Sequence, residues 1–191
     1  MLAPARRPQL AIATALVLLM TASRGHHLAS LAHLPGASWA VFFLAGAYLR
    51  PRWALPALLG LAFSLDYVAI AWQGVSEFCV SAAYVALIPA YAALWGAGRL
   101  YAARHSDTVR TLPWLAVCAL GGVVICELIS SGSFYFFSGR FAEPTLAVFA
   151  ERLATYLPGD LGNAAFWIVM ATGVHACFAM LAHTAPRGQR T

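Results

Sequence analysis

Charged side chains are scarce in this sequence, and lysine is absent altogether. Only 10% of its 191 residues are charged, whereas 61% are hydrophobic and the mean hydropathy is +0.73. A soluble globular domain carries about a quarter of its residues as charged ones, so the composition excludes that class and indicates an integral membrane protein. Without a lysine, the chain also lacks the glycine-rich phosphate-binding loop that ends in Gly-Lys, so it has no nucleotide site and cannot hydrolyse ATP alone.

Charge-free apolar runs recur at the length that a membrane helix needs, which is about 20 residues for a hydrocarbon core of about 30 Å. The runs are continuous and rich in alanine and leucine, so they do not alternate as the strands of a membrane barrel do. We therefore predict an all-α integral membrane protein with one domain, residues 1–191, formed by six transmembrane helices in one bundle. The predicted spans are 9–22, 36–49, 53–72, 78–98, 112–131 and 161–183, with an interfacial helix at about 144–157.

The basic residues predict the orientation of this bundle. All twelve are arginines, and in a six-span arrangement nine of them fall on one side. Only Arg24, Arg140 and Arg152 fall on the other side. Because cytoplasmic loops carry the excess of positive charge, both termini are predicted to be cytoplasmic in a multi-pass protein of the bacterial cytoplasmic membrane. The net charge of +5 then reflects topology, and no nucleic-acid surface is indicated. A cleavable signal peptide is the alternative for the first span, although no small-x-small cleavage site follows it.

One of the four cysteines is placed differently from the rest. Cys118, Cys126 and Cys177 lie within predicted spans without C-x-x-C spacing, and we expect them to pack as small apolar residues. Cys79 instead opens the fourth span at the outer surface, where a helix N-terminus favours the thiolate. A single thiolate is a poor site for a free ion, but it suits a metal already held in a macrocycle. A purely structural thiol is the alternative.

Asp66 is an acidic side chain within the third span, where a charge is costly unless it has a partner. It lies seven residues before Gln73 at the outer end, so about 10 Å deep at 1.5 Å per residue. Either a neighbouring helix satisfies the carboxyl group, or Asp66 contacts a ligand in a cavity open to the outside. Other polar side chains are predicted near this outer end; they are His26, His27, Cys79, Tyr84 and Arg152.

Two further polar residues lie in mid-span. Glu127 in the fifth span either pairs across helices or lines a conduction path. For His175 in the sixth span, a hydrogen bond between helices is the expected role, in preference to ligand binding.

The segments Leu65-Asp66-Tyr67 and Glu77-Phe78-Cys79-Val80-Ser81-Ala82-Ala83-Tyr84, in a layout of six helices with short loops, resemble BtuM-type cobalamin transporters. These are similar to the substrate-binding S-components of energy-coupling-factor (ECF) vitamin transporters. The resemblance implies an S-component-like fold that takes up cobalamin, with the Cys79 thiolate as an axial ligand of the cobalt. It further implies that Asp66 and Tyr84 contact the ligand or order the cysteine, and that His27 and Arg152 border the same cavity.

A thiolate is a strong donor and labilises the group on the opposite face of the cobalt, so loss of cyanide from cyanocobalamin at Cys79 is a further expectation of this resemblance. The cobalamin is then a transported ligand rather than a resident cofactor. S-components dock on the membrane coupling subunit of an ECF module, which also holds the ATPases, through small residues spaced four apart on the first helix. Ala11 and Ala15 match this spacing, but Leu19 does not, so the sequence leaves open whether such a module is needed.

Other classes remain as alternatives. A membrane thiol oxidoreductase needs a second cysteine beside Cys79, and the predicted topology places none on that side. A haem-binding membrane subunit needs paired axial histidines, for which His175 with His26 or His27 is the available combination. An S-component for another small vitamin and a structural subunit without a ligand are the remaining alternatives.

Overall fold

The computed structural model describes residues 6–24, 35–74 and 81–184, and this part of the chain is helical without any β-strand. The prediction of an all-helical protein is therefore confirmed for these residues. Two short 3-10 helices, η2 and η3, directly precede α5 and α6. The helices are α1 (Arg6–Arg24), α3 (Ser38–Tyr48), α4 (Ala54–Gln73), η2 (Ala82–Ala86), α5 (Leu87–Arg104), η3 (Val109–Thr111), α6 (Leu112–Phe137) and α7 (Leu146–Thr184).

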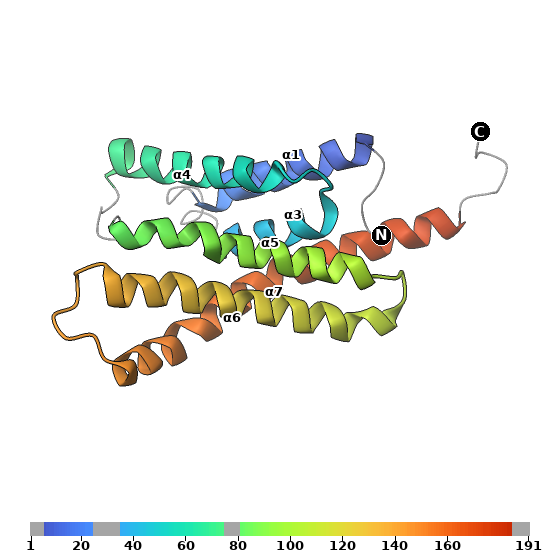
Figure 1. Cartoon of the computed structure of the whole chain (residues 1–191). Coiled ribbons are helices and arrows are strands. Elements are labelled where there is room, and N and C mark those ends of the chain that lie inside the picture. The colour runs from blue at the N-terminus through green and yellow to red at the C-terminus, as the bar shows by residue number, and fades with distance from the viewer. Residues whose placement is uncertain (1–5, 25–34, 75–80, 185–191) are drawn as a thin grey trace.

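Successive α-helices run in opposite directions along a bundle, so that α1 begins and α7 ends at the same end of it (Figure 1). The short helix α3 lies at the centre and contacts each of the other five α-helices described. Residues 40–47 of α3 are all buried. Eleven residues make a helix only about 16 Å long, about half of the thickness of a hydrocarbon core. Within the predicted span 36–49, the structure therefore has a short helix that is buried inside the bundle.

Three helical segments are long and apolar enough to cross a membrane: Ala54–Trp72, Val109–Phe137 and Leu146–Leu181. Only 11% of the most apolar window of the last segment is buried. Its outward side chains include Val169, which is 67% exposed, and Phe178, which is 69% exposed. An apolar surface of this extent is unfavourable in water but not in lipid, so these helices fit a membrane environment.

The last helix differs from its prediction. A separate interfacial helix at 144–157 and a span at 161–183 were expected. In the structure a single helix, α7, runs through both ranges with Pro158 inside it. Leu157 and Leu161, on either side of Pro158, both pack against the core. Their burial offsets the backbone hydrogen bond that the proline cannot make, so the helix continues.

Close contact between α3 and α5 fixes the centre of the bundle. A Cβ atom added to Gly98 of α5 would lie 2.0 Å from the backbone oxygen of Phe43, and one added to Gly46 of α3 would lie 2.0 Å from that of Trp95. Only glycine permits backbones to approach so closely. Next to this contact, the ring of Phe42 stacks on Tyr91 with 4.3 Å between centroids. The packing therefore holds Tyr91 rigidly beside the polar site described below.

Candidate functional site

A bidentate ion pair joins the last residue of α1 to the middle of α4. Arg24 donates from Nε to Oδ1 of Asp66 at 2.6 Å and from Nη2 to Oδ2 at 2.7 Å. The Arg24 side chain is 13% exposed and that of Asp66 is 24% exposed. Parallel hydrogen bonds between a guanidinium and a carboxylate are the strongest geometry for such a pair. The first alternative for Asp66, satisfaction by a neighbouring helix, is thus realised in the structure.

Tyr84 in η2 adds a third hydrogen bond to this carboxylate, donated by its hydroxyl group to Oδ2 of Asp66. A carboxylate offers about four acceptor sites on its two oxygens. Donors among the described residues use three of these sites, two of them on Oδ2, and leave one site on Oδ1 for a further donor. Asp66 and Tyr84, which the sequence assigned to the same site, are therefore in direct contact.

Arg24 makes two more hydrogen bonds, from Nη1 to Ser38 Oγ at 3.0 Å and to the Tyr91 hydroxyl at 3.1 Å. A guanidinium has five N–H donors, and the protein thus engages four of them. Arg24 therefore acts mainly to hold Asp66 in place. Sequence reasoning missed this role, because it used Arg24 only as an outer charge for the topology. The sequence signal for this ion pair was that Arg24 and Asp66 carry opposite charges and both lie near the outer end of a predicted span.

A cavity of about 320 Å³ opens beside this ion pair. Polar and charged residues from α1, α4, η2, α6 and α7 line it; they are Arg24, Asp66, Tyr84, Glu127, Ser130, Ser131, Arg152 and Tyr156. The structure thus brings Asp66, Tyr84 and Arg152 of the predicted site to one cavity. Arg24 also borders a second cavity, of about 200 Å³, together with Asp160 and Asn163 of α7.

Arg152 projects from α7 among aromatic rings. Its guanidinium carbon lies 5.0 Å from the ring centroid of Phe141, 5.4 Å from that of Tyr156 and 5.8 Å from that of Tyr135. Within the described part of the chain, no carboxylate is within ion-pair distance of Arg152. Cation–π contacts hold the group without neutralising its charge, so its N–H donors can still bind an anionic or carbonyl oxygen in the cavity.

Glu127 of α6 is only 3% exposed and also borders the cavity. Ser131, one turn further along α6, donates a hydrogen bond from Oγ to its Oε1 at 2.6 Å. This pairing lies within one helix, whereas the sequence analysis considered a pairing across helices or a conduction path. Glu127 therefore gives the cavity a polar inner wall.

Cys79 and His27 lie outside the described residues. In the sequence, Cys79 is four residues before Ala83, which lines the cavity, and His27 is three residues after Arg24. Cys118 and Cys126 are buried in the core, and Cys177 is exposed.

No protein-family model matches this sequence, and no curated protein matches it either. The resemblance carried by residues 65–67 and 77–84 therefore stays a prediction, and the function has to be argued from the site.

Proposed function

We propose that this protein takes up cobalamin across the bacterial cytoplasmic membrane and binds it in an outward-facing site. The observation that carries the proposal is the convergence of Asp66, Tyr84 and Arg152 on one cavity. The resemblance to BtuM-type transporters implies that these three residues and Cys79 belong to one site. The outward direction rests on the arginine distribution, which predicts that both termini are cytoplasmic.

Each of these residues contacts a different part of the ligand in this proposal. The Cys79 thiolate supplies one axial ligand to the cobalt, since the corrin ring already occupies the four equatorial positions. The free acceptor site on Asp66 Oδ1 binds an amide N–H of the corrin side chains, and Arg152 donates to an amide or phosphate oxygen. With cyanocobalamin, the Cys79 thiolate replaces the axial base on the face opposite to cyanide and forms the Co–S bond there; the Co–CN bond then breaks and cyanide leaves with its electron pair, so cobalt stays Co(III).

The volume of the cavity favours a second candidate function, an S-component for a smaller vitamin. About 320 Å³ is at the lower end of the range for small-molecule sites. It holds a side group or one edge of a corrinoid but not the whole molecule. Cobalamin binding therefore requires most of the ligand to lie beyond the cavity.

Transport needs an energy source that this chain does not contain. Ala11 and Ala15 are both exposed on α1, and Leu18 beside them is 62% exposed. This face is available to a membrane coupling subunit of an ECF module, which would bring its ATPases. Uptake without such a module is the alternative, and transport by the purified protein in liposomes distinguishes the two.

Retention of ligand by the detergent-purified protein tests the proposal. Protein is incubated with cyanocobalamin or with thiamine, riboflavin or biotin, and then desalted. We expect about one corrinoid per chain to co-elute and none of the smaller vitamins. Retention of a smaller vitamin without the corrinoid would support the second candidate, and retention of neither would remove both.

A further inference from the structure

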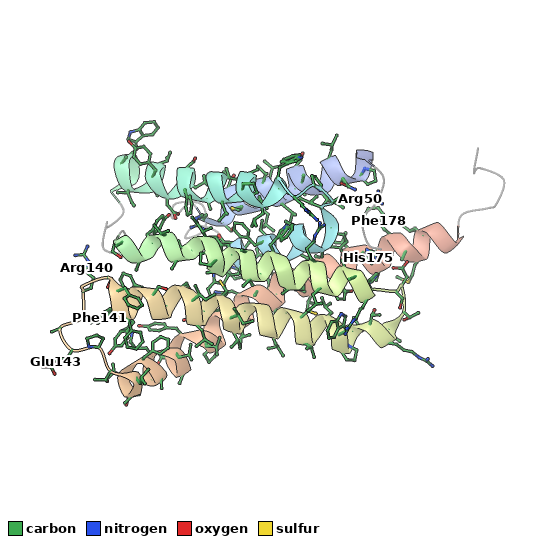
Figure 2. The ribbon with its side chains drawn as sticks, in the orientation of Figure 1. Arg50, Arg140, Phe141, Glu143, His175 and Phe178 are labelled. Atoms are coloured by element: carbon green, nitrogen blue, oxygen red, sulfur yellow. The ribbon has the colours of Figure 1, made fainter. Side chains whose placement is uncertain are left out.

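A cluster of metal-binding side chains lies at the end of the bundle opposite to the α6–α7 connection. It consists of His105 and Asp107, in the turn after α5, and His175 of α7. Figure 2 shows His175 at one end of the molecule, whereas Glu143 and Phe141 lie at the other. The sequence analysis expected His175 in mid-span with a helix-to-helix hydrogen bond. The structure instead places the ring of His175 beside the carboxylate of Asp107, in the turn after α5. Helix α7 continues for nine residues after His175.

The distances within the cluster suit coordination of one ion. Nε2 of His105 lies 2.9 Å from Asp107 Oδ1, and Nε2 of His175 lies 3.1 Å from the same oxygen. All three ligand atoms are within 4.8 Å of one another. In a tetrahedral site with bonds of about 2.0–2.2 Å, neighbouring ligand atoms are about 3.3 Å apart. Two of the three separations are within a few tenths of an ångström of this value, and the third, at up to 4.8 Å, has to shorten by about 1.5 Å, which rotation of the exposed Asp107 and the partly exposed His175 side chains can supply.

The surroundings already orient the first histidine. Nδ1 of His105 lies 2.7 Å from the hydroxyl group of Tyr101, a buried residue that is 6% exposed. A histidine that binds metal through Nε2 carries its proton on Nδ1, and the Tyr101 hydroxyl group is placed to accept a hydrogen bond from it in this tautomer.

We propose that His105, Asp107 and His175 bind one divalent transition-metal ion, with Zn²⁺ as the best match to two imidazoles and one carboxylate. The His105 side chain is 10% exposed and His175 is 32% exposed, whereas Asp107 is 63% exposed. The ion keeps at least one position open to water and exchanges with the medium on the predicted cytoplasmic side. By joining α7 to the turn after α5, it stabilises this end of the bundle.

Metal titration of the detergent-purified, chelator-treated full chain tests this proposal. We expect one Zn²⁺ per chain by calorimetry, a rise in Tm on addition of Zn²⁺, and no such response to Mg²⁺, which does not favour imidazole ligands. Co²⁺ should give the absorption bands of a tetrahedral site. His105→Gln and His175→Gln should each abolish the tight binding, and Tyr101→Phe should weaken it about tenfold while leaving one ion per chain.

Two matched controls guard against adventitious binding. His33→Gln removes a histidine that is not one of the three ligands, and Glu143→Gln removes an exposed acid at the opposite end. Both should bind Zn²⁺ as the wild type does. If the wild type binds no Zn²⁺, or if His175→Gln binds it unchanged, the cluster is a hydrogen-bonded triad only. This outcome would be independent of cobalamin binding, which uses none of these residues.

Discussion

Arg24 and Asp66 form a bidentate ion pair that joins the end of α1 to the middle of α4, with hydrogen bonds of 2.6 and 2.7 Å. Both side chains border the cavity, yet each is mostly covered by protein. The pair therefore neutralises an acid within an apolar helix and also sets the position of Tyr84. We therefore expect stability and the proposed ligand binding to depend on the same contact.

Breaking one side of this pair should cost more than removing both charges. Arg24→Gln leaves the Asp66 carboxylate without its main partner, and we expect a loss of about 2 kcal/mol in the free energy of unfolding. Arg24→Gln with Asp66→Asn should recover part of that loss, because no uncompensated charge remains. Unfolding in detergent, followed by tryptophan fluorescence, measures the free energy of unfolding of Arg24→Gln, of Asp66→Asn and of the double variant. If the losses of the two single variants add up to the loss of the double variant, the two residues are not coupled.

Tyr84→Phe should weaken cobalamin binding while the protein stays folded. The change removes the hydrogen bond to Asp66 Oδ2, and a bond to a charged group contributes about 1.5 kcal/mol or more, so we expect an affinity about tenfold lower. Tyr67→Phe is the matched control, because Tyr67 follows Asp66 directly but is 71% exposed. Equal affinities for wild type and Tyr84→Phe would remove Tyr84 from the binding site.

Gly98→Ala should destabilise the bundle, because its Cβ would lie 2.0 Å from the backbone oxygen of Phe43 and the helices cannot separate without losing core contacts. A loss of about 2 kcal/mol or more is expected. Gly96→Ala on the same helix meets nothing within 4 Å and should be neutral or slightly stabilising. Thermal unfolding of the two variants in the same detergent compares them, and similar Tm values would contradict the close packing of α3 on α5.

The predicted helix bounds agree best with the structure for two helices. Helix α4 was predicted at 53–72 and spans Ala54–Gln73, and α6 was predicted at 112–131 and begins at Leu112. Both are long apolar runs that begin shortly after an arginine, so charge and hydropathy mark where they start. The short helix α3 has the same composition, but its apolar residues face protein instead of lipid. Amino-acid composition therefore does not distinguish a helix that faces protein from a helix that faces lipid.

The polar contacts were harder to predict, because they depend on how the helices are rotated against one another. Asp66 and Tyr84 were assigned to one site through a motif, whereas the partner Arg24 became visible only in the packed bundle. In the same way, Asp107 and His175 are 68 residues apart and meet only because α7 passes the turn after α5. Sequence periodicity gives the face of one helix and says nothing of the neighbour that it meets.

The most direct test of cobalamin binding through Cys79 is the absorption spectrum of the detergent-purified protein mixed with cyanocobalamin, recorded beside Cys79→Ala. Thiolate coordination changes the electronic transitions of the corrin, so we predict that the bands shift with the wild type, that cyanide is released, and that the variant leaves the spectrum of the free vitamin unchanged. A spectrum that stays that of free cyanocobalamin with the wild type, or one that shifts equally with Cys79→Ala, would contradict the proposed function of the thiolate.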